Sequence, residues 1–197
     1  MKKWCYHLYP GSLNPCSMTK AASALARATW LCVGCSSPRP ESTAIDVYLQ
    51  DNEPTGVLNF VNGHGVPLIR RDLLLSFGEE VVNRDLHVGQ VFGPDERELS
   101  AWATFRARQR VIIRGSKNVS CRKCRRCGRI VYFATGPRYL CPSPPKADVL
   151  SESDLFGLVM PESLFTEAQH DRSRLVGVQC DRLPMVEIPR DGLPILL

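Results

Sequence analysis

Two pairs of cysteines have the residue type and the spacing to hold a metal ion. Cys32 and Cys35 form one Cys-x-x-Cys turn, and Cys124 and Cys127 form another. Each turn presents two thiolates to one point, and two turns complete the tetrahedral four-sulfur site that zinc accepts. Four protein ligands leave no open coordination position. The pattern therefore predicts a structural zinc ion rather than a catalytic one.

The long separation between the two pairs leaves a second arrangement open. Between Cys35 and Cys124 lie 88 residues, whereas compact zinc ribbons place about 15–20 residues there. The long-range site therefore requires that the segment between the two pairs, about residues 36–120, form a folded insertion. A local site would use Cys121 and Cys141 in place of the first pair, and would leave Cys32 and Cys35 unused. We favour the long-range site, and a chain without metal also stays open.

Composition favours a single domain over residues 1–197. The chain has 197 residues, of which 44% are hydrophobic, enough to build an apolar core. It has nine cysteines but no apparent export signal, so we expect reduced thiols and a cytoplasmic protein. No apolar run is long enough to span a bilayer. We expect Cys5, Cys16 and Cys180 to be buried or inert thiols.

Hydrophobic periodicity indicates an α+β fold. Its centre is expected to be a zinc-ribbon-like double Cys-x-x-Cys core with a long folded insertion and a C-terminal strand-helix-strand segment. The expected helices cover 19–29, with Thr19 as the N-cap, 67–77, 99–110 and 162–169. The expected strands cover 45–49, 57–61, 81–83, 87–92, 111–113, 155–160, 175–178 and 185–188, with a hairpin over 129–141 turning at Gly136-Pro137.

The charges are strongly segregated along the chain. Ten Lys or Arg residues and no acid lie in 106–129, and six acids and no Lys or Arg lie in 148–171. The basic segment could bind nucleic acid, with Trp102, Phe105, Tyr132 and Phe133 stacking on bases. It could instead be a solvated face whose cations offset the −2 charge of a zinc tetrathiolate. We favour the second interpretation, because half of the ten cations lie within two residues of Cys124 or Cys127.

The chain resembles the double-CxxCG motif proteins of myxobacteria, a group that includes immunity proteins paired with polymorphic toxins. The resemblance rests on Trp30-Leu31 before the first pair, on the long insertion, and on Cys124-Arg125-Arg126-Cys127-Gly128. Ser36 stands where the family would have a glycine after its first pair. Similar C-terminal segments are Asp154-Leu155-Phe156, Glu162-Ser163-Leu164-Phe165, Val176-Gly177-Val178 and Leu183-Pro184-Met185-Val186.

The resemblance implies a non-catalytic protein that binds a cognate protein toxin inside the producing cell. Such inhibition requires only a complementary surface, and the four histidines show no pairing with acids that would suggest an enzyme. The acidic residues Asp154, Glu162, Glu167 and Asp171 are the candidates for contacting a basic toxin, because acidic patches steer such associations. The alternative is a zinc-ribbon nucleic-acid-binding or regulatory protein that uses residues 106–129. A metal-dependent or thiol enzyme is the third possibility.

Overall fold

The fold is seen in a computed structural model that describes residues 4–11, 15–39, 41–50, 53–61, 65–140, 149–153, 157–169 and 175–185. Within these ranges, the backbone alone is described at 116–122, 130–135, 137, 139 and 167–169. The elements in chain order are β1 (Trp4–Pro10), α1 (Lys20–Thr29), β2 (Val47–Tyr48), β3 (Leu58–Val61), β4 (Val66–Arg70), α2 (Arg71–Ser76), α3 (Glu79–Asp85), β5 (Leu86–Gly89), β6 (Val91–Phe92), β7 (Trp102–Ala107), β8 (Arg110–Val111), β9 (Ile113–Lys123), β10 (Ile130–Leu140), β11 (Ser151–Ser153), β12 (Leu158–Pro161), α4 (Glu162–Gln169) and β13 (Val178–Pro184). The expected α+β class is confirmed, with strands predominating.

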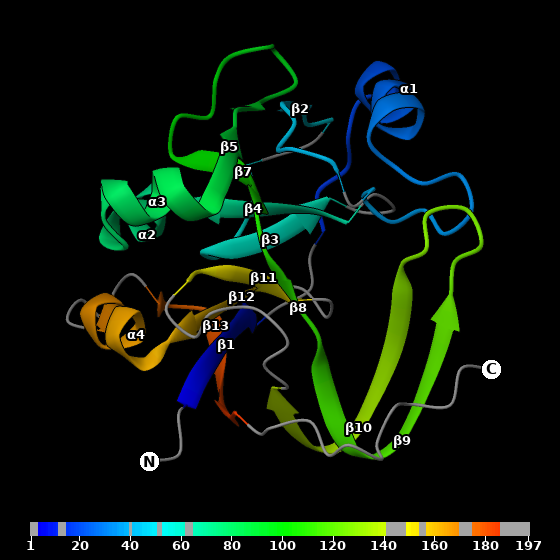
Figure 1. Ribbon diagram of the computed structural model, residues 1–197. Helices are drawn as coiled ribbons and strands as arrows, with labels where there is room; N and C mark the ends of the chain where they lie inside the picture. Colours follow the sequence, from blue (N-terminus) through cyan, green and yellow to red (C-terminus); the bar gives the residue numbers. More distant parts are fainter. Residues whose placement is uncertain are drawn as a thin grey trace.

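Two larger sheets form the body of the protein (Figure 1). One is antiparallel, with strand order β3-β4-β7-β5. The other has the order β13-β1-β12-β11-β8, and only its β11–β8 pair is parallel. Two further pairs are the parallel β2–β6 and the antiparallel hairpin β9–β10. In Figure 1 the hairpin reaches from the base of the molecule to the loop that follows α1.

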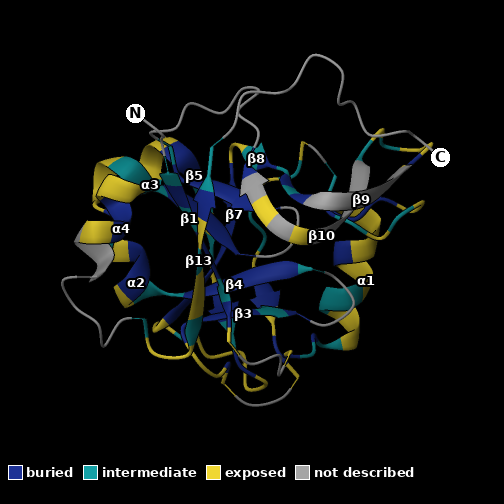
Figure 2. Ribbon diagram, turned by 90° about the horizontal axis from the view of Figure 1, so that it is seen from below, coloured by how far each residue is buried: buried dark blue, intermediate teal, exposed yellow. Residues whose placement is uncertain are grey.

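The main hydrophobic core lies between the two larger sheets. Leu8 and Met160 from one sheet, and Ile69 and Phe105 from the other, belong to the same buried cluster, together with residues of α2 and α4 such as Phe165. Figure 2 shows the buried residues gathered in the central strands, while the helices turn exposed faces outward. The apolar area removed from water here is the principal stabilising contribution to the fold.

A second core cluster lies on the opposite face of the four-stranded sheet, under α1. Leu68 and Trp102 extend from β4 and β7 into this cluster, where they meet Ala26 and Trp30. Thr19 caps α1 as predicted, since its side chain accepts a hydrogen bond from the backbone N–H of Ala22. The sheet is thus covered on both faces, and this second cluster joins α1 to it.

Because of this double burial, the helix predicted at 99–110 is wrong and the one predicted at 67–77 is right only in its second half. Residues 67–77 form strand β4 followed by the short helix α2, and residues 99–110 contain strand β7. All six residues of β7 are buried, so the strand lacks the alternation of apolar and polar residues that marks a half-buried strand. The neighbours Leu68 and Ile69 are buried in different clusters, on opposite faces of the sheet. Because apolar residues therefore occupy consecutive positions, their spacing resembles that of a helix.

Two smaller predictions also fail. The expected strand at 81–83 lies in helix α3, whose first turn carries Glu79 and Glu80, a placement that the helix dipole favours. The expected hairpin within 129–141 is one continuous strand, β10, which passes Gly136-Pro137 with shifts in register and pairs with β9. The predicted strand at 57–61 and helix at 162–169 are confirmed as β3 and α4. The predicted strand at 185–188 lies outside the described residues, apart from Met185.

Candidate metal centre

The first Cys-x-x-Cys turn directly follows helix α1. The helix ends at Trp30, whose backbone N–H donates to the carbonyl of Ala26. An isolated bridge between Leu31 and Pro38 then closes the loop that contains Cys32 and Cys35. Because Trp30 is only 2% exposed, its indole anchors the base of this turn in the second core cluster.

The second Cys-x-x-Cys turn connects β9 to β10, and its backbone repeats the first. The N–H of Cys32 donates to the carbonyl of Ser37 at 2.9 Å, and that of Ser36 donates to the carbonyl of Cys32 at 2.8 Å. In the second turn, Cys124 donates to Arg129 at 2.8 Å, and Gly128 donates to Cys124 at 2.9 Å. The two loops, which β2 to β9 separate along the chain, therefore share the same backbone hydrogen-bond pattern.

Both turns contain a left-handed residue directly after the second cysteine. Ser36 has a φ of 52° and Gly128 a φ of 70°. Glycine adopts such a φ without a steric penalty, whereas other residues do so at a cost. Ser36 thus takes the conformation that glycine provides in the second turn.

The four sulfur atoms form a cluster that could bind a metal ion. The Sγ of Cys32 lies 3.8 Å from that of Cys124, and the Sγ of Cys35 lies 3.7 Å from that of Cys127. All four sulfurs lie within 4.8 Å of one another. A regular tetrahedron with metal–sulfur bonds of about 2.3 Å has edges of about 3.8 Å. The donors therefore fit a tetrathiolate site, and all four cysteines are free thiols rather than disulfides.

Gly34 allows the two turns to approach each other. A Cβ atom at this position would lie 2.8 Å from the Cγ of Arg126 and 3.1 Å from the Sγ of Cys124. These distances are shorter than ordinary van der Waals contact. The middle of the first turn must therefore carry a glycine for the second turn to come this close.

The surroundings of the sulfurs favour thiolates at some positions and oppose them at others. Backbone N–H groups of Cys127 and Arg126 lower the pKa of the Cys124 thiol to about 6. The N–H of Gly34 donates to the Sγ of Cys32 at 3.3 Å and lowers the pKa of that thiol as well. Burial raises the pKa of Cys127 to about 12. A divalent cation would stabilise all four as thiolates, and acidification would release it, because protons compete for the same sulfurs.

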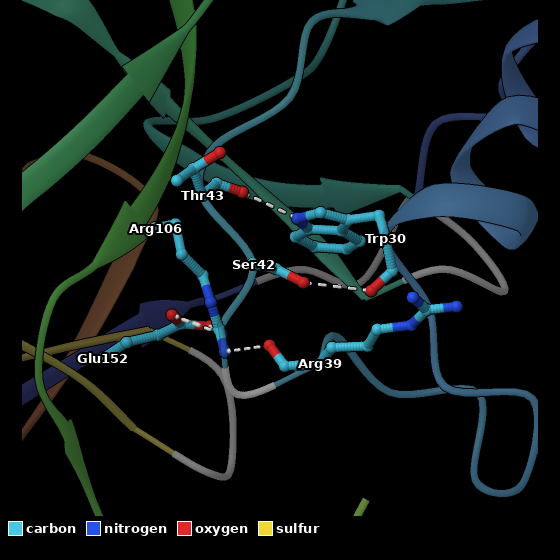
Figure 3. A network of polar contacts seen from close by, with 6 residues as sticks. All are labelled: Trp30, Arg39, Ser42, Thr43, Arg106 and Glu152. Carbon is cyan, nitrogen blue, oxygen red and sulfur yellow. Dashed lines mark hydrogen bonds and ion pairs between the residues drawn. The ribbon is translucent and has the colours of Figure 1, made fainter.

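A hydrogen-bonded loop behind the first turn fixes it to the protein interior (Figure 3). The indole Nε1 of Trp30 donates to the carbonyl of Thr43 at 2.7 Å, and the hydroxyl of Ser42 donates to the carbonyl of Trp30 at 3.0 Å. These bonds link the end of α1 to the chain that leaves the turn. They satisfy polar groups that would otherwise be buried without partners.

A buried ion pair holds the same loop against both sheets. Nη1 of Arg106, on β7, lies 2.9 and 2.7 Å from the two carboxylate oxygens of Glu152, on β11, and Nη2 donates to the carbonyl of Arg39 at 3.4 Å (Figure 3). The side chains of Arg106 and Glu152 are only 2% and 7% exposed. The sequence did not predict this pair, because its partners belong to the separate basic and acidic segments, 106–129 and 148–171. No local signal marks a contact between residues 46 positions apart.

The burial of Arg106 changes the interpretation of the basic segment. Trp102 and Phe105, proposed to stack on bases, are each 1% exposed and belong to the core. The described cations near the second turn are exposed at Lys123, Arg125 and Arg126 and half-buried at Arg129. Side chains at Tyr132 and Phe133 are outside the described residues.

Among the remaining predicted partner-contacting residues, the side chain of Glu162 alone is described. Glu162 is exposed and lies 3.2 Å from Arg182 in an ion pair. Asp154 and Asp171 lie outside the described residues, as does the side chain of Glu167. Of the rival local ligands, Cys141 lies outside the described residues, and Cys121 pairs with Tyr132 in the hairpin backbone. Cys5 and Cys16 are buried as expected, but Cys180 is exposed.

Comparisons with models of known protein families, with characterised proteins and with solved structures give no match for this chain. Within the described part of the chain, no helix combines the length and apolar character required to cross a membrane. The four-cysteine cluster is therefore the feature from which a function must be argued.

Proposed function

We propose that this chain is a non-catalytic immunity protein that binds and neutralises a cognate polymorphic toxin. In this proposal a structural zinc ion at Cys32, Cys35, Cys124 and Cys127 holds a zinc-ribbon-like centre together. The observation that carries the proposal is that two matching turns, far apart in the chain, present four thiols at tetrahedral spacing.

The ligand set supports zinc in a structural role. Tetrahedral sites of four soft thiolates are typical of zinc or of iron–sulfur centres. Four protein ligands leave no position for a water molecule or a substrate, so such a site contributes to folding rather than to catalysis. A metal centre of this kind suits a protein whose activity is binding.

The toxin partner rests on the resemblance to double-CxxCG motif proteins. The left-handed φ of Ser36 supports that resemblance, because the one residue that departs from the motif keeps the conformation glycine would have. The acidic residues Asp154, Glu162, Glu167 and Asp171 are the proposed contact surface for a basic toxin. The exposed Glu162 would exchange its pairing with Arg182 for a pairing with the partner.

Co-expression with a toxin encoded by an adjacent gene tests this proposal. We expect the wild-type chain to restore growth and to bind the purified toxin. Reversal of three proposed contacts, by Glu162→Lys, Glu167→Lys and Asp171→Lys, should weaken that binding. A charge-matched control reverses the exposed Glu79, Glu80 and Glu96, which lie outside α4. Failure to protect against any adjacent toxin would contradict the function, whereas unchanged affinity in the first variant would contradict only the surface.

Binding of nucleic acid is the competing proposal, favoured by the exposure of Lys123, Arg125 and Arg126. Electrostatic binding of this kind weakens steeply with salt. A salt-dependent shift of DNA or RNA that persists near physiological salt, and is lost on substitution of Arg122, Arg125 and Arg126, would favour this alternative over the immunity proposal.

A further inference from the structure

A small cavity lies directly beside the four-cysteine cluster. It has a volume of about 210 Å³ and takes its walls from the chain leaving the first turn, from the residue that follows the second turn by two positions, and from β8 and β11. Its polar lining comprises Ser36, Ser37, Arg110, Arg129, Glu152 and Ser153. The metal centre and the five-stranded sheet therefore share this cavity.

Two arginines in the cavity wall, Arg110 and Arg129, are half-buried. The Nε of Arg110 is buried, and no described atom accepts a hydrogen bond from it. No carboxylate of the described residues lies within ion-pair distance of Arg110 or Arg129. Buried donors are nearly always satisfied in folded proteins. A hydrogen-bond acceptor other than the described protein atoms would satisfy the Nε of Arg110.

The described carboxylate that lines this cavity already contacts another arginine. Glu152 is the parallel-strand partner of Arg110, but both of its carboxylate oxygens contact Arg106, the nearer at 2.7 Å. The cavity consequently carries one neutralised pair and two further guanidinium groups, of which that of Arg129 also interacts with the charge of the Cys35 thiol. The hydroxyl of Ser153 also lies in the wall, 2.9 Å from the Nε2 of the buried His7. The lining thus combines positive charge with hydroxyl groups.

We propose that this cavity binds a single phosphate group, held by Arg110 and Arg129 beside the metal centre. Guanidinium groups form paired, charge-assisted hydrogen bonds with phosphate oxygens. The cavity is smaller than the roughly 300–1,000 Å³ of pockets that hold drug-sized ligands, so it suits one group rather than a whole nucleotide. This proposal goes beyond the toxin-binding function and does not depend on it.

The position of the cavity couples the anion to the metal centre. Ser36 and Ser37 directly follow Cys35, and Arg129 follows Cys127 by two residues. A bound phosphate would therefore connect both turns to β8. Because it would bind the folded state and not the unfolded chain, it should raise the midpoint of thermal unfolding as its concentration increases.

Titration of the zinc-loaded protein with inorganic phosphate, followed by calorimetry and by thermal unfolding, tests the proposal. Arg110→Gln and Arg129→Gln should each weaken phosphate binding by about tenfold or more, because each removes charge-assisted hydrogen bonds. The matched control is Arg125→Gln, an exposed arginine of the second turn that does not line the cavity. Zinc content, measured for every variant, verifies that the metal centre is intact.

The outcomes distinguish phosphate binding in the cavity from non-specific attraction of anions to the protein surface. No binding of phosphate by the wild type, or equal weakening in the Arg125→Gln control, would overturn the proposal. Selective loss in Arg110→Gln, with zinc retained, would support it. Competition by a short oligonucleotide with a 5′-phosphate, and none by its unphosphorylated form, would assign the group to a terminal phosphate. Displacement by free phosphate alone would assign it to a soluble anion.

Discussion

At the scale of single residues, Ser36 and Gly128 are equivalent positions with different side chains. Both have a positive φ and both follow the second cysteine of their turn. The side chain of Ser36 is exposed, so its replacement removes no packing. What differs between the two turns is therefore the conformational cost of a Cβ atom in the left-handed region.

We predict that Ser36→Gly stabilises the zinc-loaded protein by up to about 1 kcal/mol, since it relieves a left-handed non-glycine residue. The mirror substitution, Gly128→Ser, should destabilise it by about 1 kcal/mol for the same reason. Urea unfolding of the two variants beside the wild type measures both effects. A loss of stability in Ser36→Gly would show that the serine side chain makes a compensating contribution.

At the scale of elements, the Arg106–Glu152 pair connects β7 of one sheet to β11 of the other and holds the loop after the first turn. A buried ion pair contributes little net stability compared with apolar residues of the same size. The loss of one partner is costly, however, because it leaves the other charge buried and uncompensated.

We predict that Glu152→Ala lowers the free energy of unfolding by about 3–5 kcal/mol, through the uncompensated Arg106. Arg70→Ala is the matched control, because it removes an ion pair whose side chains are 42% and 45% exposed, and such pairs contribute at most about 1 kcal/mol. Denaturant unfolding compares the two. An equally small effect in both variants would mean that water reaches the Arg106 guanidinium once the carboxylate is removed.

Elements also show where sequence reasoning succeeded and failed. Helix α1 and its Thr19 cap were predicted because the helix propensity of its alanines and the capping threonine are both local signals. Strand β7 was mistaken for part of a helix, because burial on both faces erases the alternation that identifies a strand. The link between Arg106 and Glu152 depends on the packing of two sheets, which no local pattern encodes.

At the scale of the whole molecule, the two cysteine turns lie side by side although they are far apart in the chain. The two Cys-x-x-Cys turns were enough to favour these four cysteines as one cluster, but not to show that β2 to β9 would return the chain to its first turn. The chain returns because its middle part folds into a four-stranded sheet that is covered by a hydrophobic cluster on each face. The base of the β9–β10 hairpin is fixed in a third cluster, which joins Ile113 and Leu140 to the five-stranded sheet.

The most direct test is the amount of zinc per chain in the wild type and in a Cys32→Ser/Cys35→Ser variant, by elemental analysis and native mass spectrometry. Cys180→Ser, which alters an exposed thiol outside the cluster, is the control. We predict one zinc ion per chain in the wild type and the control, and none in the double variant. Zinc retained by the double variant would contradict the long-range centre and move the site to the cysteines around the second turn.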